Sequence, residues 1–156
     1  MIAEIGQFVL ILALVLAVIQ ATLPLWGAAR GDTALMTLAD RTAVGQAVAL
    51  LIAFGALTHG FVTSDFSLTV VFQNSHSLKP MLYKVSGVWG NHEGSMLLWV
   101  LVLALFSAAV ALFGRNLPPS LRARVLAVQA MIGVGFLAFV IFTSNPFARI
   151  SPTPLD

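Results

Sequence analysis

KVSGVWGNHEGSMLLW, residues 84–99, brings most of the unusual polar and aromatic residues of this chain to the start of a long apolar run. The run covers residues 95–114 and contains no Asp, Glu, Lys or Arg. About 20 apolar residues are enough for a helix to cross the roughly 30 Å hydrocarbon core of a bilayer. The stretch therefore predicts a polar turn at a membrane surface, followed by a membrane-spanning helix.

The polar turn has the residues of a helix start. Asn91 is a suitable N-cap, and Glu93 would lie in the first turn, where free backbone N–H groups and the helix dipole favour a carboxylate. One interpretation is purely structural, with Trp89 as an interfacial anchor and the glycines permitting a tight turn. The other is that Gly90 and Gly94 permit close approach of a ligand or a second chain to the backbone.

The composition places the whole chain in a membrane. Hydrophobic residues make up 59%, charged residues 9%, and the mean hydropathy is +0.97, whereas soluble domains contain roughly 25% charged residues. There is no cysteine, so the chain has no disulfide and no thiol chemistry of its own. The eight basic residues are scattered among the loops, so the net charge of +2 does not indicate nucleic-acid binding.

Four apolar runs predict an all-α integral membrane protein with transmembrane helices near residues 5–26, 44–63, 95–114 and 125–144. Pro24 is expected to end or kink the first helix. Residues 27–43 are expected to form a short polar loop. Residues 64–91 are expected to form a long loop, in which the β-branched stretch near residues 65–75 is compatible with a short strand or an interfacial segment.

The basic residues predict the orientation. The first and third loops contain five of them and the opposite side contains three, so the positive-inside rule places both termini and the long second loop outside, facing the periplasm in a bacterium. The two sets are Arg30, Arg41, Arg115, Arg122 and Arg124, against Lys79, Lys84 and Arg149.

Three polar residues outside the turn are candidates for helix contacts or ligands. Gln20 lies on a stripe of alanines and is expected to hydrogen-bond to another helix. His59 shares a helix face with Gly55 and Gly60, so it is expected to face a close helix neighbour, with haem ligation as the alternative. His76 is expected to face solvent.

The string WGNHEGSMLLW resembles the WGxHEGSxxLW signature of the CcmF family, the haem-handling membrane proteins of cytochrome c maturation. Three further strings are similar to that family in the same order: GQFVLILAL with LPLWG between residues 6 and 27, QNS at residues 73–75, and FTSNPF at residues 142–147. The resemblance covers essentially the whole chain, but only the beginning of a typical family member. The chain is therefore expected to be an N-terminal part of such a protein, as a fragment or the product of a split gene.

The resemblance implies a component of the haem lyase machinery in the bacterial inner membrane. It would handle haem at the periplasmic face and aid its covalent attachment to apocytochrome c, with a haem chaperone and other maturation proteins of the membrane as partners. It implies a transmembrane pair and loop over residues 1–88 and the start of the haem-handling domain at residues 89–156. The site residues it implies are Trp89, Gly90, His92, Glu93 and Gly94.

The same resemblance limits what this chain is expected to do by itself. The tryptophan-rich segment and the haem-ligating histidines of the family have no match here, so we assign no axial ligand, catalytic residue or metal ligand. Haem lyase activity would belong to the full-length protein and its complex, and the chain alone is not expected to bind haem. The alternative function is a small membrane scaffold or transporter subunit without haem chemistry.

Overall fold

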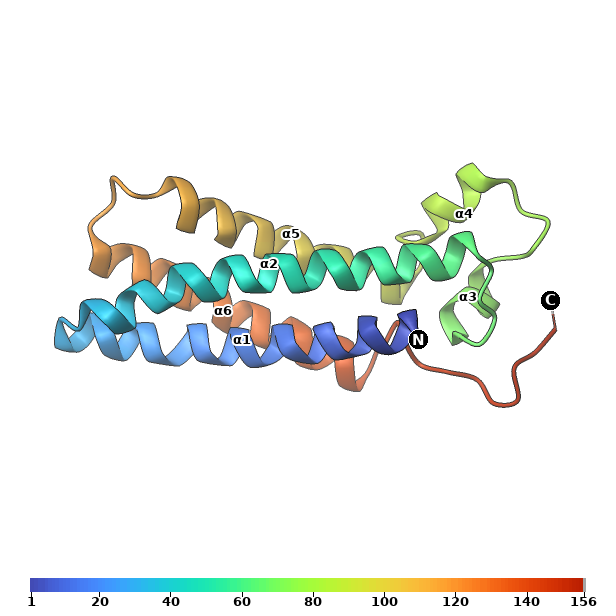
Figure 1. Cartoon of the computed structure of the whole chain (residues 1–156), viewed down its shortest axis with the longest axis horizontal. Helices are drawn as coiled ribbons and strands as arrows, with labels where there is room; N and C mark the ends of the chain where they lie inside the picture. Colours follow the sequence, from blue (N-terminus) through green and yellow to red (C-terminus); the bar gives the residue numbers. More distant parts are fainter. Residues whose placement is uncertain (156) are drawn as a thin grey trace.

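The computed structural model describes residues 1–155, and Asp156 lies outside the described residues. Four long helices form a bundle: α1 (Ile2–Arg30), α2 (Thr33–Val62), α5 (His92–Phe113) and α6 (Pro119–Phe142). Two short helices, α3 (Thr69–Asn74) and α4 (Met81–Gly87), lie between α2 and α5 at one end of the bundle (Figure 1). The prediction of an all-α protein with four long apolar helices is confirmed.

The connection between α1 and α2 is much shorter than predicted. Gly31 ends α1 in the left-handed conformation, with φ 71° and ψ 21°, which glycine adopts without a steric penalty. Asp32 then caps α2, because its Oδ1 accepts hydrogen bonds from the backbone N–H groups of Ala34 at 3.0 Å and Leu35 at 3.4 Å. Two residues are therefore enough to reverse the chain.

This geometry corrects two expectations. The prediction of a polar loop over residues 27–43 is wrong, because those residues extend α1 and begin α2. Of the two expectations for Pro24, that it ends α1 is wrong, because α1 continues to Arg30, and a kink at Pro24 stays a prediction. The charged residues of this region misled the sequence interpretation, since at about 1.5 Å per residue a helix of 30 residues is longer than a bilayer core and can carry charges beyond it.

The helices pack as two antiparallel hairpins. The α1–α2 pair lies against α6, while α5 packs on α2 and α6 (Figure 1). Alanines and leucines fill the core, and the fully buried examples include Leu10, Leu50, Leu57, Leu97 and Leu137. Small residues allow the helix backbones to approach closely, which is the usual basis of helix association in membranes.

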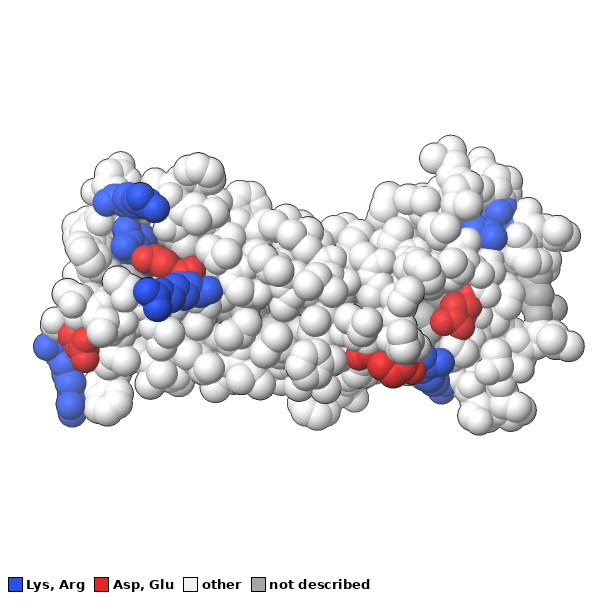
Figure 2. Space-filling view, in the orientation of Figure 1, with Lys and Arg blue, Asp and Glu red and all other residues white. Residues whose placement is uncertain are grey.

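All four long helices are long and apolar enough to span a membrane. Figure 2 shows the charged side chains gathered at the two ends of the molecule, with an uncharged surface between them. The N-terminus and the segment after α6 lie at the end that carries α3 and α4, whereas the α1–α2 turn and the α5–α6 loop lie at the other (Figure 1). The fold is therefore that of a multi-pass membrane protein.

Gln20 makes the helix contacts that its position predicts. Its side chain is fully buried, and its Nε2 donates to the backbone carbonyl of Leu126 in α6 at 2.8 Å. Gln46 in α2 donates from Nε2 to Gln20 Oε1 at 2.6 Å. One amide thus links three helices inside the apolar region, where an unpaired polar group would be costly.

The segment that follows α6 forms backbone hydrogen bonds with the segment that leads into α3. The backbone N–H of Thr69 donates to the carbonyl of Ala148, and that of Ile150 to the carbonyl of Ser67, each at 2.9 Å. Leu68 and Arg149 form an isolated antiparallel bridge. Residues 65–75 otherwise form a turn and α3, so of the two alternatives for this stretch the short strand is reduced to a single bridge.

Candidate functional site

Asn91 organises the turn that precedes α5. Its side-chain Oδ1 accepts a hydrogen bond from the backbone N–H of Gly94 at 2.7 Å, which confirms the predicted N-cap. Its Nδ2 donates to the carbonyl of Gly87 at 2.7 Å and that of Val88 at 3.3 Å. A single side chain therefore connects the end of α4 to the start of α5.

The two glycines of the turn are not equivalent. A Cβ atom at Gly94 would lie 1.6 Å from the backbone oxygen of Val88, which is far too close for any side chain. A Cβ atom at Gly90 would lie 3.2 Å from the carbonyl oxygen of Ser86, a tight contact that small shifts relieve. Gly94 is therefore required for the shape of the turn, whereas Gly90 is exposed on its surface.

Trp89 and Glu93 present polar and aromatic groups at this end of the bundle. The Trp89 side chain is 45% exposed. Glu93 lies in the first turn of α5, as predicted, where the helix dipole favours its carboxylate. The Glu93 carboxylate makes no hydrogen bond or ion pair with the part of the chain that the structure describes, so it is available to an external group.

His92 is oriented by contacts with α6 and the residues after it. Its Nδ1 lies 3.2 Å from the hydroxyl oxygen of Ser144, and its ring meets that of Phe139 edge to face, with 6.0 Å between the centroids. Ser144 is buried, whereas His92 remains largely exposed. A hydrogen bond at one ring nitrogen fixes the orientation of an imidazole and leaves Nε2 for another partner.

An apolar groove of about 510 Å³ begins at His92 and runs between α5 and α6. Its other lining residues are Met96, Met131, Ile132, Gly135, Phe136 and Phe139. Large apolar ligands bind to such surfaces, and a few polar groups at the edge determine their orientation. The site thus combines one oriented imidazole with an apolar surface.

The other two histidines lie on different elements. His59, in the last turn of α2, is exposed, so the prediction that it faces a close helix neighbour is wrong. His76 is exposed in the loop after α3, as predicted, and its Nδ1 accepts from the backbone N–H of Leu78 at 3.1 Å. Among residues 1–155 the structure shows no cluster of three or more His, Asp or Glu that could hold a metal ion.

Sequence reasoning identified the turn but not its partner. Ser144 lies within the FTSNPF string, yet its distance of 52 residues from His92 gave no sign that the two side chains meet. The groove was also missed, because its residues are ordinary apolar positions of two helices.

Comparison with known proteins shows that the chain is similar to cytochrome c-type biogenesis proteins. The family model described as "Cytochrome C assembly protein" matches residues 89–155. Over the whole chain, the sequence is 62% identical to the cytochrome c-type biogenesis protein ccl1 of Rhodobacter capsulatus and 54% identical to CcmF of Pseudomonas aeruginosa. It is 45% identical to CcmF of Escherichia coli over 97% of the chain.

A solved structure named "Cytochrome c Heme Lyase CcmF" is similar in fold, with a TM-score of 0.90 and 28% sequence identity over 97% of this chain. The match covers 26% of that protein. In the same way, this chain spans 24% of the length of each of the three curated relatives named above. The matches therefore cover nearly all of this chain but only about a quarter of each relative.

Proposed function

Because this chain belongs to the CcmF family of cytochrome c-type biogenesis proteins, we propose that it forms a membrane part of the machinery that attaches haem to apocytochrome c. Within that machinery, the turn at residues 89–95 and the adjoining groove help to handle haem at the outer membrane face. The haem lyase activity itself belongs to the longer protein and its complex.

The observation that carries this proposal is the position of His92. Its imidazole is held by Ser144 at the rim of an apolar groove, and the same stretch of chain carries the exposed Trp89 and the unpaired Glu93. A haem presents a large apolar ring, an iron that accepts imidazole and two carboxylates. An aromatic residue, an imidazole and a groove lined by methionine and phenylalanine suit the first two of these features.

The site has only some of the groups that a stable haem site needs. The groove offers apolar contact and one imidazole, whereas the other two imidazoles of the chain are on α2 and in the loop after α3. Neither of these histidines lines the groove. The site is therefore suited to transient contact with haem, and we assign no axial ligand to it.

The proposed orientation places this site outside the cytoplasm. Arg30 ends α1, and Arg115, Arg122 and Arg124 lie near the α5–α6 loop, at the end opposite to α3 and α4 (Figure 1). Arg41 lines the same pocket as Arg115 and Arg122. Basic residues favour the cytoplasmic side. With both termini outside, the segment between α2 and α5 faces the periplasm, and the protein lies in the bacterial inner membrane.

We place the boundary between two parts of the chain just before the turn at residues 89–95. Residues 1–88 supply the first helix pair and the outer segment, while residues 89–156 begin the haem-handling domain. The match of the cytochrome c assembly family to residues 89–155 supports this boundary. A haem chaperone, apocytochrome c and other maturation proteins of the membrane would be the partners of the complete protein.

A chimera provides the test. This chain would replace the matching segment of the Rhodobacter capsulatus protein, to which it is 62% identical, in cells that lack the natural copy. We expect Trp89→Ala, His92→Ala and Glu93→Ala each to reduce covalent haem on c-type cytochromes, measured by haem staining, while the amount of chimera in membranes is unchanged. His59→Ala and His76→Ala are the matched controls.

Three outcomes separate the possibilities. Loss of haem attachment at normal protein level, restricted to the turn variants, supports the proposal. A parallel loss of protein and haem attachment would mean that the turn is only structural. A working chimera in which all three turn variants mature cytochromes normally would favour the scaffold alternative, in which these helices pack against partners without contacting haem.

A further inference from the structure

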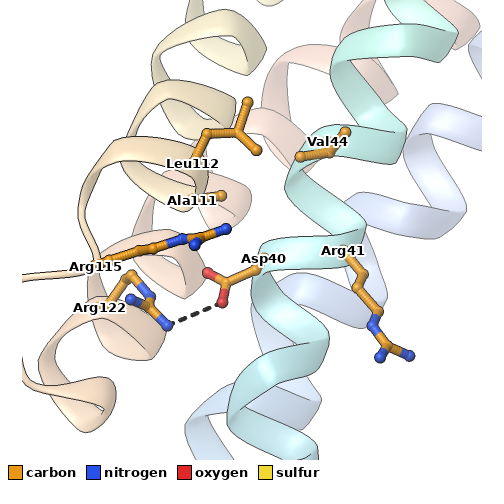
Figure 3. Close-up of a pocket in the computed structure, with 7 residues that line it drawn as sticks. All are labelled: Asp40, Arg41, Val44, Ala111, Leu112, Arg115 and Arg122. Atoms are coloured by element: carbon orange, nitrogen blue, oxygen red, sulfur yellow. Dashed lines mark hydrogen bonds and ion pairs between the residues drawn. The ribbon is translucent and has the colours of Figure 1, made fainter.

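A second pocket lies at the opposite end of the bundle, between α2 and α5 (Figure 3). It has a volume of about 430 Å³, and its lining is divided between charged and apolar residues. The charged residues are Asp40, Arg41, Arg115 and Arg122, and the apolar ones are Val44, Ala111 and Leu112. The proposed haem function uses none of them.

One arginine of this pocket is fixed in place. Arg122 Nη2 lies 3.0 Å from Asp40 Oδ2, and Arg122 Nη1 donates to the backbone carbonyl of Gly114 at 3.3 Å. Both side chains of the ion pair are mostly buried, with 15% of Arg122 and 26% of Asp40 exposed. The pair connects α2 to α6 and orders the guanidinium before any ligand arrives.

The pocket has an excess of positive charge. Arg115 extends toward Asp40 in Figure 3, yet neither Arg115 nor Arg41 forms an ion pair with the described part of the chain. The Arg41 side chain points away from the other charged groups in Figure 3, so Arg115, Arg122 and Asp40 leave a formal charge of +1 within the pocket. Uncompensated guanidinium groups at the edge of an apolar region favour an anionic partner.

The apolar side of the pocket lies deeper in the bundle than the charges. Val44 follows Asp40 by one helical turn in α2, and Ala111 and Leu112 precede Arg115 at the end of α5. Figure 3 shows these three apolar residues together above Asp40, Arg115 and Arg122. A ligand that filled the pocket would therefore need an anionic head and an apolar body.

We propose that this pocket binds the headgroup of an anionic phospholipid. The phosphate would accept hydrogen bonds from Arg115 and Arg122, since guanidinium groups recognise phosphate through paired N–H donors. The first acyl carbons would lie along Val44 and Leu112. A free phosphate ion would use the same arginines and leave the apolar wall exposed, so the wall favours the lipid.

The experiment compares lipid retention by the purified chain reconstituted in a mixed bilayer of phosphatidylcholine and phosphatidylglycerol. Native mass spectrometry would count the phosphatidylglycerol molecules that stay bound. We expect Arg115→Gln to weaken retention about fivefold, the effect that one basic residue typically has near an anionic membrane surface. Arg115 is chosen because its loss leaves the Asp40–Arg122 pair intact.

Arg124→Gln is the matched control, because Arg124 is exposed on the same end of α6 and does not line the pocket. Equal loss of lipid in the two variants would overturn the proposal in favour of a general surface charge. Stabilisation of the wild type by inorganic phosphate in pure phosphatidylcholine, equal to that by phosphatidylglycerol, would also overturn it, in favour of a free anion. Circular dichroism of both variants verifies that they are folded.

Discussion

His92 Nδ1 and Ser144 Oγ lie 3.2 Å apart and join the start of α5 to the segment just after α6. The contact holds the imidazole at the rim of the apolar groove. Its partner residue lies outside the polar turn, so the site is built from two distant parts of the chain. The contribution of Ser144 to haem attachment can therefore be measured separately from that of the His92 imidazole.

In the chimera, Ser144→Ala should reduce haem attachment less than His92→Ala, because it removes only the group that orients the ring. The double variant should be no worse than His92→Ala alone, since Ser144 acts through His92. Haem staining and immunoblots of the unmodified chimera, the two single variants and the double variant provide the double-mutant cycle. Additive losses would show that Ser144 has a separate role.

Gly94→Ala should destabilise the protein, because the added Cβ would lie 1.6 Å from the carbonyl oxygen of Val88. A forced backbone shift of this kind typically costs about 1 to 3 kcal/mol. Gly90→Ala is the control, with a nearest contact of 3.2 Å and an expected smaller loss. Thermal unfolding in detergent measures both, and equal stability of the two variants would contradict the geometry.

Gln20→Leu should weaken the bundle because it removes two hydrogen bonds between helices, each of which contributes about 0.6 kcal/mol on average and about 1.7 kcal/mol at most. The variant leaves the Nε2 of Gln46 without its acceptor. Unfolding in detergent mixtures of Gln20→Leu, Gln46→Leu and the double variant gives the coupling between the two amides. Strictly additive losses would show that their contact contributes nothing.

Reporter fusions should show that the two ends of the bundle lie on opposite sides of the membrane. Fusions at Asp32 and Asn116 are expected to be cytoplasmic, because they lie in the connections at the arginine-rich end, while a fusion at Ser75 is expected to be periplasmic. A fusion at Asp156, which lies outside the described residues, should also be periplasmic. The reverse pattern would mean that the charge bias misleads here.

The purified chain should not bind haem stoichiometrically. The groove is lined by one imidazole, and among the described residues no other histidine lines it. Absorption spectra during haem titration measure this directly. A Soret band at one haem per chain that disappears in His92→Ala would contradict the prediction and make His92 an axial ligand.

The sequence alone determined the features that depend on short stretches of chain. Four uncharged runs predicted four helices, Asn91 was identified as a cap, and Gln20 was identified as a helix contact. These features follow from length, hydropathy and capping, which act within a few turns of helix. The same local rules overestimated the loop at residues 27–43, because charged residues on helices that extend past the bilayer resemble a loop in composition.

Only the tertiary structure decided which side chains meet. His92 and Ser144 are 52 residues apart, Asp40 and Arg122 are 82 apart, and Gln20 and Leu126 are 106 apart. His59 illustrates the same limit, since the bundle buries the neighbouring Gly60 against Leu68 but leaves His59 and Gly55 exposed. Such contacts depend on how whole helices pack, and helix packing is set by the sum of many weak contacts that no short stretch of sequence contains.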